Sequence, residues 1–362
     1  MGRGEGKSDT CSFPWAKDWI HQGNIYMEHP QTIAELGELG LLKRLFRYCP
    51  GDVIGDDGAV VALPPGRHLV VTTDVLVEGV HFSDRTTPAA AVGWRAVAAN
   101  LSDLAAMGAT PEGITVGLSL PGHTPLAWVE GLYQGMADCL NRWGGVVLGG
   151  DLCRADAVSV AITALGSVDP QRALYRSQAQ PGQAIVVTGY HGLSRAGLEL
   201  LLHPDRGTEV AQADRDRWIA AHQQPQPRLD AIAALWQVLG ADADARAIAV
   251  MDSSDGLANA VLHLCQSSGV GAVLQESDLP IDGALVDWVG RSQALDWCLY
   301  GGEDFELVLC LPWPQAQALQ AALGKGCAIV GETTVATRVE LWPDDRAAPV
   351  VLSFSQGFQH FD

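Results

Sequence analysis

The sequence predicts an α+β protein built from two halves that meet near residues 170–180. Segments with the alternation or continuity of strands are interleaved with segments that repeat apolar residues at helical spacing. A length of 362 residues gives each half enough chain to bury a core of its own. Hydrophobic residues make up 48% and charged residues 18%, which is typical of a globular chain.

The first half alternates strands and helices from Thr32 onward. Apolar residues mark one face of a helix between Thr32 and Leu45. Two apolar segments around the turn at Pro64–Gly66 predict a hairpin. A long helix is expected from Thr87, as its N-cap, to about Met107. A strand, a helix and two more strands are expected at residues 113–120, 125–143, 145–150 and 159–168.

The second half begins with a strand at residues 184–189 and a helix at 194–202. Residues 203–228 are polar and charged, and we expect a surface excursion there. Helices, strands and a short α/β tail are expected to complete the half, with the main elements at residues 228–239, 247–252, 255–266, 271–275 and 300–311.

The first 26 residues are rich in glycine and show no hydrophobic period, so we expect a poorly ordered extension. The predicted domains are therefore an N-terminal one at residues 27–170 and a C-terminal one at residues 171–362.

Charge and composition exclude several classes of protein. A formal charge of −19 argues against a nucleic-acid partner, which requires a basic surface. The chain has four lysines, none in a P-loop motif. Its eight cysteines include no C-x-x-C pair, which indicates a reduced, cytoplasmic protein without structural zinc. No apolar segment is long enough to span a membrane.

Acidic residues recur at predicted strand ends, beside glycine, serine and threonine. One such loop alone is usually a turn or a helix N-cap. Several together favour a site where Mg²⁺ ions hold phosphates, because Mg²⁺ prefers carboxylate oxygens. The loops are Gly55–Gly58, Thr72–Asp74, Gly149–Asp151, Asp252–Gly256 and Gly301–Asp304, and Asp103 joins them from a helix.

Two other residues have a functional and a structural interpretation. His81 follows a strand and is placed to touch a phosphate, although a single histidine at a strand end is commonly structural. Arg176 is placed to clamp a phosphate, although most single arginines are solvated. No Ser-His-Asp or Cys-His arrangement is present, so no protein nucleophile or general base is expected.

At these residues the sequence resembles the thiamine-monophosphate kinase family of the PurM-like superfamily, which is named after aminoimidazole ribonucleotide synthetase. The resemblance covers about residues 32–361, and its motifs occur in the family's order. The matching segments are IGDDGAVV, TTDVLVEGVHF, GWRAVAANLSDLAAMGATP, VLGGD, ALYRSQAQPGQAIVVTG, MDSSDGL and YGGEDFELVL.

The resemblance implies a role for each matched position. The implied Mg²⁺ ligands are Asp57, Thr72, Thr73, Asp74, Asp103, Asp151, Asp252 and Asp255. The implied ATP contacts are Gly150, Asp151, Arg176, Ser254 and Tyr133. The implied contacts to thiamine phosphate are His81, Glu303 and Phe358. The resemblance also implies a homodimer in which N-terminal strands of both chains form a shared barrel, and a C-terminal α/β half.

One loop departs from the family's usual pattern. Where the family commonly reads R-S-G-A-K-P-G-D, this chain has Gln178, Gln180 and Gln183 in place of the glycine, the lysine and the acid. Arg176 is kept.

The resemblance implies Mg²⁺-dependent transfer of the γ-phosphoryl group of ATP to thiamine monophosphate, which gives thiamine diphosphate. Two alternatives stay open from the sequence. One is another ATP-using PurM-like enzyme, of the aminoimidazole ribonucleotide or selenophosphate synthetase type. The other is a non-catalytic sensor of nucleotide or thiamine phosphate.

Overall fold

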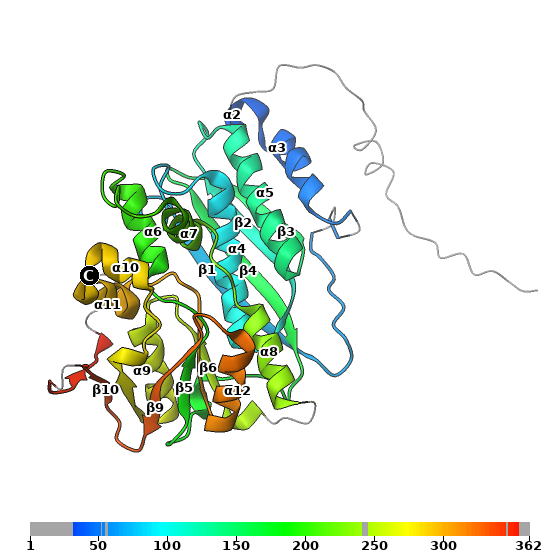
Figure 1. Cartoon of the computed structure of the whole chain (residues 1–362). Coiled ribbons are helices and arrows are strands. Elements are labelled where there is room, and N and C mark those ends of the chain that lie inside the picture. Colours follow the sequence, from blue (N-terminus) through cyan, green and yellow to red (C-terminus); the bar gives the residue numbers. More distant parts are fainter. Residues whose placement is uncertain (1–31, 52, 55–56, 241–244, 345–346, 355–362) are drawn as a thin grey trace, which may run out of the picture.

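The computed structural model describes residues 32–354 except 52, 55–56, 241–244 and 345–346. It contains two sheets, each covered by helices, which confirms the α+β class (Figure 1). A four-stranded sheet lies within residues 68–168, and a seven-stranded sheet lies within residues 184–351.

The N-terminal sheet has the strand order β1-β4-β2-β3. Strand β4 pairs antiparallel with both β1 and β2, whereas β2 and β3 are parallel. The strands are β1 (His68–Val77), β2 (Thr110–Leu120), β3 (Val147–Arg154) and β4 (Ser159–Val168).

Helices α4 (Ala89–Ala106) and α5 (Leu126–Trp143) pack together over one face of this sheet. Their backbones meet so closely that glycine is required on both sides. A Cβ on Gly93 would lie 1.9 Å from the carbonyl oxygen of Leu132, and one on Gly135 would lie 1.8 Å from that of Ala90. Helix α4 is alanine-rich and almost entirely buried.

The other face of the N-terminal sheet carries exposed apolar side chains. Alternate residues of β1 point to opposite sides of the sheet. Leu69, Val71 and Val75 are 47%, 56% and 47% exposed, respectively. The alternate residue Leu76 is 7% exposed. We call Leu69, Val71 and Val75 the open apolar face of β1.

The C-terminal sheet has the order β11-β10-β7-β9-β5-β8-β6. Strands β5, β8 and β6 are buried along their whole length, which explains why their sequences read as continuous apolar segments. The strands are β5 (Ala184–Val187), β6 (Ala249–Asp252), β7 (Gly271–Gln275), β8 (Leu307–Leu311), β9 (Ala328–Thr334), β10 (Val339–Trp342) and β11 (Val350–Val351).

Short 3₁₀ turns at Arg176–Gln178, Ala245–Ala247 and Glu276–Asp278 connect some of these elements. The helices of this half are α6 (Leu193–Leu202), α7 (Gln212–Gln223), α8 (Leu229–Leu239), α9 (Leu257–Ser268), α10 (Gly283–Val289), α11 (Arg291–Tyr300) and α12 (Trp313–Leu323).

At the start of the described chain, the expected single helix is broken in two. Thr32 and Glu35 form a capping box that begins α2 (Ile33–Leu36). Gly37, at φ +73°, ends this turn, and α3 (Glu38–Leu45) follows, then a 3₁₀ turn at Phe46–Tyr48. The break leaves Leu39, one of the apolar residues at helical spacing between Thr32 and Leu45, 67% exposed.

Three other expectations differ from the structure. Residues 57–67 form no strand, and β1 pairs with β4 rather than in a hairpin. The N-cap of α4 is Pro88, one residue later than expected, and the Thr87 hydroxyl lies 3.1 Å from that of Thr86. The expected surface excursion contains helix α7, whose Trp218 is fully buried against α6 and Trp288.

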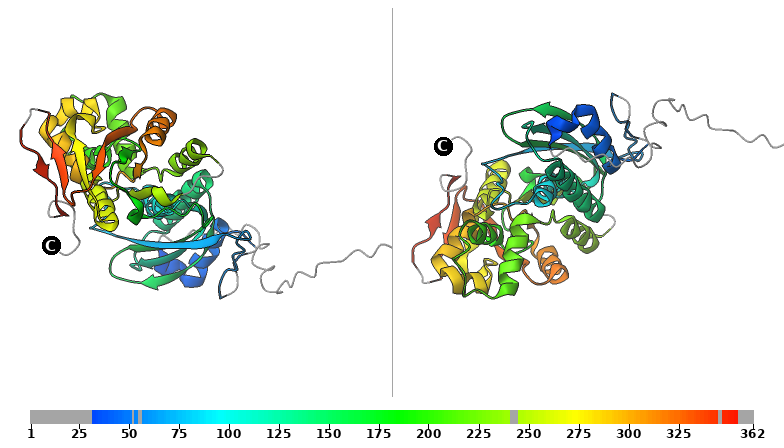
Figure 2. Two further views of the ribbon diagram at one scale, coloured as in Figure 1. Left: turned by 90° about the horizontal axis from the view of Figure 1, so that it is seen from below. Right: turned by 90° about the horizontal axis from the view of Figure 1, so that it is seen from above.

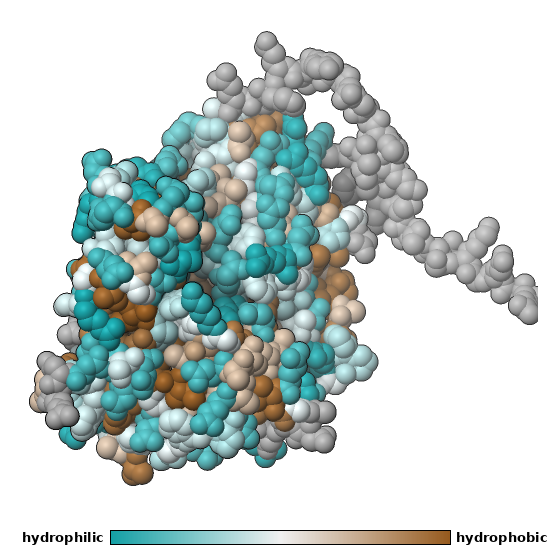
Figure 3. All heavy atoms as spheres, viewed as in Figure 1, coloured by the Kyte–Doolittle hydropathy of each residue, from teal (hydrophilic) through white to brown (hydrophobic). Residues whose placement is uncertain are grey.

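The two halves lie side by side and share part of a core (Figure 2). Ala105 and Ala106, at the end of α4, join Leu174 and residues of the C-terminal sheet in one hydrophobic cluster. The surface seen in Figure 3 is mostly hydrophilic with separate apolar patches. Among the residues that the structure describes, no helix combines the length and apolarity needed to cross a bilayer.

Candidate active site

A cavity of about 1300 Å³ lies between the two halves. Its walls come from β1 and the turn after it, from α4 and α6, from the loop after β6, and from α11 with the loop that follows. Residues for which the resemblance implies metal, ATP and thiamine phosphate contacts therefore share one cavity. Those that line it are Thr73, Asp74, His81, Ser254, Asp255 and Glu303.

Carboxylates from both halves interact beside this cavity. Burial, and then the charges of Asp103 and Asp255, raise the pKa of Asp74 to about 6. Burial, and then the charge of Asp103, raise the pKa of Asp252 to about 7. These shifts have the sign expected where like charges are held together away from water. β1, α4 and the loop after β6 thus bring their acids to one place.

Helix α4 links this cluster through two neighbouring side chains. The hydroxyl of Thr72 on β1 donates a hydrogen bond to Asp103. The hydroxyl of Ser102 donates to Asp252 at 3.1 Å, across the boundary between the halves. Burial raises the pKa of Asp103, and the hydrogen bond from Thr72 opposes that rise. One turn of α4 therefore fixes carboxylates that belong to different halves.

Arg176 provides positive charge beside the acids. Its guanidinium is close enough to lower the pKa of Asp103 and Asp252, against the larger effect of burial. The residue is exposed, and its carbonyl accepts a hydrogen bond from Ser268 of α9 at 2.9 Å. This contact holds the 3₁₀ turn at Arg176–Gln178 against the helix.

Two of the substituted glutamines in the adjoining loop have structural contacts. Gln183 is buried, and its side chain accepts from the backbone of Gln180 at 2.9 Å and donates to the carbonyl of Ala247 at 2.6 Å. The amide at position 183 thus supplies a donor that a carboxylate would lack.

Some predicted site residues lie apart from this cavity. Asp74 pairs with Ile162, which pairs with Val116, which in turn pairs with Gly150. Gly150 therefore lies three strand spacings from Asp74, roughly 14 Å. Its neighbour Asp151 shares that distant edge strand, β3.

Two further predicted residues do not line the cavity, and a third lies outside the described residues. Asp57 is exposed in the segment before β1. Tyr133 is 4% exposed in the N-terminal core, with its ring centre 5.7 Å from that of Tyr48, and burial raises its pKa. Phe358 lies outside the described residues. The roles implied for all these positions stay predictions.

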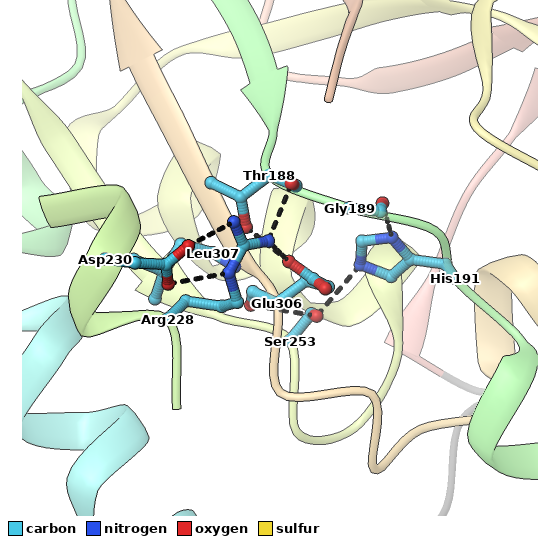
Figure 4. Close-up of polar contacts among 8 residues, drawn as sticks. All are labelled: Thr188, Gly189, His191, Arg228, Asp230, Ser253, Glu306 and Leu307. Carbon is cyan, nitrogen blue, oxygen red and sulfur yellow. Dashed lines mark hydrogen bonds and ion pairs between the residues drawn. The ribbon is translucent and has the colours of Figure 1, made fainter. Parts of the chain in front are cut away.

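A buried polar network contacts the loop Asp252–Asp255 through Ser253 (Figure 4). Ser253 is fully buried, and its backbone N–H donates to the carbonyl of Glu306 at 2.8 Å. Its hydroxyl lies 2.9 Å from Nε2 of His191, whose Nδ1 lies 3.1 Å from the carbonyl of Gly189. A carbonyl only accepts, so Nδ1 carries the hydrogen, and the single hydrogen of the Ser253 hydroxyl is shared between Nε2 and the carbonyl of Glu306, 3.1 Å away. Burial lowers the pKa of His191 to about 4, so the ring is neutral.

The same network continues to helix α8. Glu306 accepts from the Thr188 hydroxyl at 2.6 Å and pairs with Arg228. Arg228 also pairs with Asp230 in a two-bond contact, at 3.1 Å for each bond (Figure 4). These contacts satisfy the charges buried at the ends of β5 and β8.

The loop Gly301–Phe305 is fixed in an unusual conformation. Glu303 and Phe305 have φ values of +59° and +53°, which non-glycine residues rarely adopt. The N–H of Glu303 donates to the carbonyl of Ser254 at 2.6 Å. The loop that carries Glu303 is thus tied directly to the loop of the acidic cluster.

Asp304, in the same acidic motif, has a structural role. Its carboxylate accepts from the backbone N–H groups of Gly192 at 2.7 Å and Ser194 at 2.9 Å, at the start of α6. It therefore caps that helix. Burial raises its pKa to about 7 despite these bonds.

The sequence analysis missed several cavity residues, including Arg95, Arg195 and Trp297. The guanidinium carbon of Arg195 lies 5.3 Å from the centre of the Trp297 ring. Arg95 left a usable signal in the sequence, because it places a charge within the apolar, alanine-rich first part of a helix. Arg195 left none, because an arginine on an amphipathic helix is normally solvated.

The acidic cluster fits Mg²⁺ in its chemistry. Its donors are oxygens, and it concentrates carboxylates whose repulsion a divalent cation would relieve. Across the described ranges, no group of three or more His, Cys, Asp or Glu side chains is close enough together to hold a metal ion.

Comparisons with known proteins identify the family to which the chain belongs. The model of the AIR synthase related protein N-terminal domain matches residues 55–168, and that of the C-terminal domain matches residues 180–343. The thiamine-monophosphate kinase of Synechococcus elongatus is 49% identical over 91% of this chain and 98% of its own.

Two solved structures are similar over most of the chain. The thiamine-monophosphate kinase of Stenotrophomonas maltophilia has a TM-score of 0.71 and 34% identity, over 81% of this chain and 90% of its own. A second structure, of AaThiL complexed with AMPPCP and TMP, has a TM-score of 0.69 and 29% identity, over 92% of this chain and 100% of its own. The chain therefore belongs to the thiamine-monophosphate kinase family, a family of phosphotransferases built on the AIR synthase related fold.

Proposed function

We propose that this protein transfers the γ-phosphoryl group of ATP to the phosphate of thiamine monophosphate in a Mg²⁺-dependent reaction. The products are thiamine diphosphate and ADP. The observation that carries the proposal is the cluster of carboxylates from both halves beside a cavity of about 1300 Å³. The relatives named above support the choice of substrates.

The ligands for Mg²⁺ in this proposal are carboxylates that already interact: Asp74, Asp103, Asp252 and Asp255. Bound Mg²⁺ supplies positive charge between the two phosphates, which otherwise repel one another. Thr72 orients Asp103, and Ser102 orients Asp252, so the oxygens are held before substrates arrive. Thr73, Asp57 and Asp151 remain proposed ligands on the evidence of the motifs.

The chain's other residues divide between the two substrates. Arg176 and Ser254 are proposed to hold ATP beside the acids, with Gly150, Asp151 and Tyr133 as further contacts. His81 and Glu303 are proposed to contact thiamine phosphate, with Phe358 as a third contact. The backbone N–H of Val77 donates to Nδ1 of His81 at 3.0 Å, which fixes the orientation of this ring at the cavity wall.

The transfer itself needs little proton movement. An oxygen of the acceptor phosphate forms a bond to the γ-phosphorus of ATP as the bond from that phosphorus to the β–γ bridging oxygen breaks, and ADP leaves with the electron pair. The acceptor phosphate is ionised near pH 7, so it needs no general base. Catalysis then rests on positioning and charge stabilisation.

We also propose that the protein works as a homodimer in the cytoplasm. The open apolar face of β1 is the surface proposed to meet the second copy, since exposed apolar surface of this kind commonly marks an interface. None of the cysteines in the described part of the chain forms a disulfide, which suits a reducing compartment.

The decisive test is to follow formation of thiamine diphosphate from ATP and thiamine monophosphate, with and without Mg²⁺. We expect product only when Mg²⁺ is present, and none from unphosphorylated thiamine. Tight ATP binding without turnover would favour the sensor alternative. Turnover that does not depend on a divalent cation would contradict the role given to the acidic cluster.

A further inference from the structure

Arg95 is a buried residue of helix α4 whose guanidinium places a positive charge at the cavity wall. Its side chain is 2% exposed, yet it lines the cavity between the halves. One nitrogen, Nη2, donates to Oε1 of Glu303 in the opposite half. The other, Nη1, lies 3.1 Å from Nε2 of His222 on α7.

The atoms that contact His222 define the protonation state of its ring. A guanidinium only donates, so Nε2 of His222 accepts. Burial, and then the charge of Arg95, lower the pKa of His222 to about 3, which agrees with a neutral ring. Its Nδ1 lies 3.2 Å from the hydroxyl of Ser194 and 3.8 Å from Oε2 of Glu303. Arg95 and His222 therefore face the two different oxygens of the Glu303 carboxylate.

Glu303 is fixed by its backbone and by its side chain independently. Its N–H is bonded to Ser254, and its φ of +59° is one that only a well-supported loop retains. Its side chain is 33% exposed and lines the cavity. The backbone contacts set where the residue lies, and Arg95 sets where its carboxylate points.

We propose that Arg95 is a positioning residue for the acceptor substrate, because it holds the Glu303 carboxylate in the orientation that contacts thiamine phosphate. The inference rests on the proposed function, since it assigns Glu303 to the acceptor. Arg95 acts through Glu303 and does not touch the transferred group. Its loss should therefore weaken the acceptor and leave ATP binding largely unchanged.

Other contacts between the halves do not depend on Arg95. Nε1 of Trp94 donates to the carbonyl of Pro225 at 2.8 Å, and Nε2 of Gln223 donates to the carbonyl of Thr86 at 2.7 Å. These bonds keep α7 docked on α4 when Arg95 is replaced. Trp94→Phe is the matched control, because it removes a buried bond between the halves one residue away without touching Glu303.

The experiment measures thiamine diphosphate formation by the full-length chain and by Arg95→Gln, Arg95→Lys, Glu303→Gln, Arg95→Gln/Glu303→Gln and Trp94→Phe. For Arg95→Gln we expect the KM for thiamine monophosphate to rise roughly tenfold or more, with the KM for ATP changed by less than about twofold. Arg95→Lys should recover part of the loss. The double variant should be no worse than Glu303→Gln alone, because the two residues act as one unit.

Two results would overturn the inference while the proposed function stands. One is an active wild type whose Arg95→Gln variant keeps its KM for thiamine monophosphate. The other is an equal rise of both KM values, in Arg95→Gln as in Trp94→Phe, which indicates a general structural role. Thermal unfolding checks that each variant folds. If Arg95→Gln does not fold, the KM values of Arg95→Lys and Glu303→Gln test the positioning role instead. A wild type that forms no thiamine diphosphate removes the proposed function and this inference with it.

Discussion

Asp74 occupies a position that is useful for metal binding and unfavourable for the metal-free fold. Burial and two neighbouring carboxylates raise its pKa, so its negative charge is held there at a cost. We expect Asp74→Asn to lower turnover by roughly 100-fold or more, and to raise the melting temperature of the metal-free protein because it removes repulsion.

Calorimetry with and without Mg²⁺, beside the turnover assay, checks this prediction. The matched control is Asp216→Asn, on the exposed surface of α7. Wild type and control should gain thermal stability from Mg²⁺, whereas Asp74→Asn should gain less. An Asp74→Asn variant with normal turnover would rule out the proposed ligand.

His191 makes stability depend on pH. Its pKa is about 4 in the folded protein and 6.5 for an ordinary histidine, so below pH 6.5 the unfolded chain binds a proton that the folded chain does not. Stability should therefore fall as the pH drops from about 6.5 toward 4, by up to about 3 kcal/mol from this group.

Urea unfolding of wild type and His191→Gln between pH 7 and pH 5 isolates the effect, since the two proteins share every other titrating group. The variant should be less stable at pH 7 but lose less stability on acidification. The half-exposed His203 provides the control substitution, His203→Gln, which should leave the wild-type slope in place. Parallel curves for wild type and His191→Gln would contradict the prediction.

At the scale of elements, the contact between α4 and α5 depends on two glycines. A methyl group on Gly135 would overlap the backbone of Ala90, which cannot move aside as a flexible side chain would. We expect Gly135→Ala to cost about 3 kcal/mol or more in the free energy of unfolding.

Gly131→Ala in the same helix is the control, since its added carbon would lie 3.2 Å from the Cβ of Ala89 and at an ordinary 3.9 Å from the backbone nitrogen of Ala90. The gain in helix propensity, about 1 kcal/mol, offsets much of the unfavourable energy of that close contact. Chemical denaturation measures both. Equal stability of the two variants would show that α5 shifts to accept the methyl group.

The helices and strands also show which parts of the fold can be predicted from sequence patterns. Continuous apolar segments predicted the buried strands β5, β6 and β8, because a central strand needs apolar residues on both faces. Helix α7 was missed, since its sequence is polar on most sides and only Trp218 and His222 among its residues are buried. The hairpin before β1 was wrong because β1 pairs with β4, a partner about 90 residues away that no local turn signal identifies.

In the candidate site too, features set by local sequence were predictable and features set by distant contacts were not. The acidic loops were recognisable because each acidic residue and its neighbouring glycine lie within a few residues of each other in the sequence. The contacts of Arg95 and His222 with Glu303 were not recognisable, since each becomes a neighbour of Glu303 only when α4 and α7 pack across the halves. Asp304 was grouped with the acids by its motif, although the structure uses it to cap α6.

At the scale of the whole molecule, the open apolar face of β1 predicts assembly. We expect Val71→Lys to place a charge in the proposed interface and to shift the protein toward monomer, because a buried unpaired charge is costly. Light scattering coupled to size-exclusion chromatography measures the change. Val335→Lys, at an equally apolar and 81% exposed position in the other half, should leave the mass unchanged. A wild type that is monomeric at micromolar concentration would contradict the proposed dimer.

Helix α4 belongs to the N-terminal half by sequence and to both halves by contact. It supplies Ser102 to Asp252 and Arg95 to Glu303, and its last turn, with Ala105 and Ala106, lies in a core made mostly by the other half. A gene divided near residue 176 would therefore encode two fragments with mutually dependent folding. Neither would make a self-sufficient module for domain shuffling, and activity would return only when both fragments are produced together.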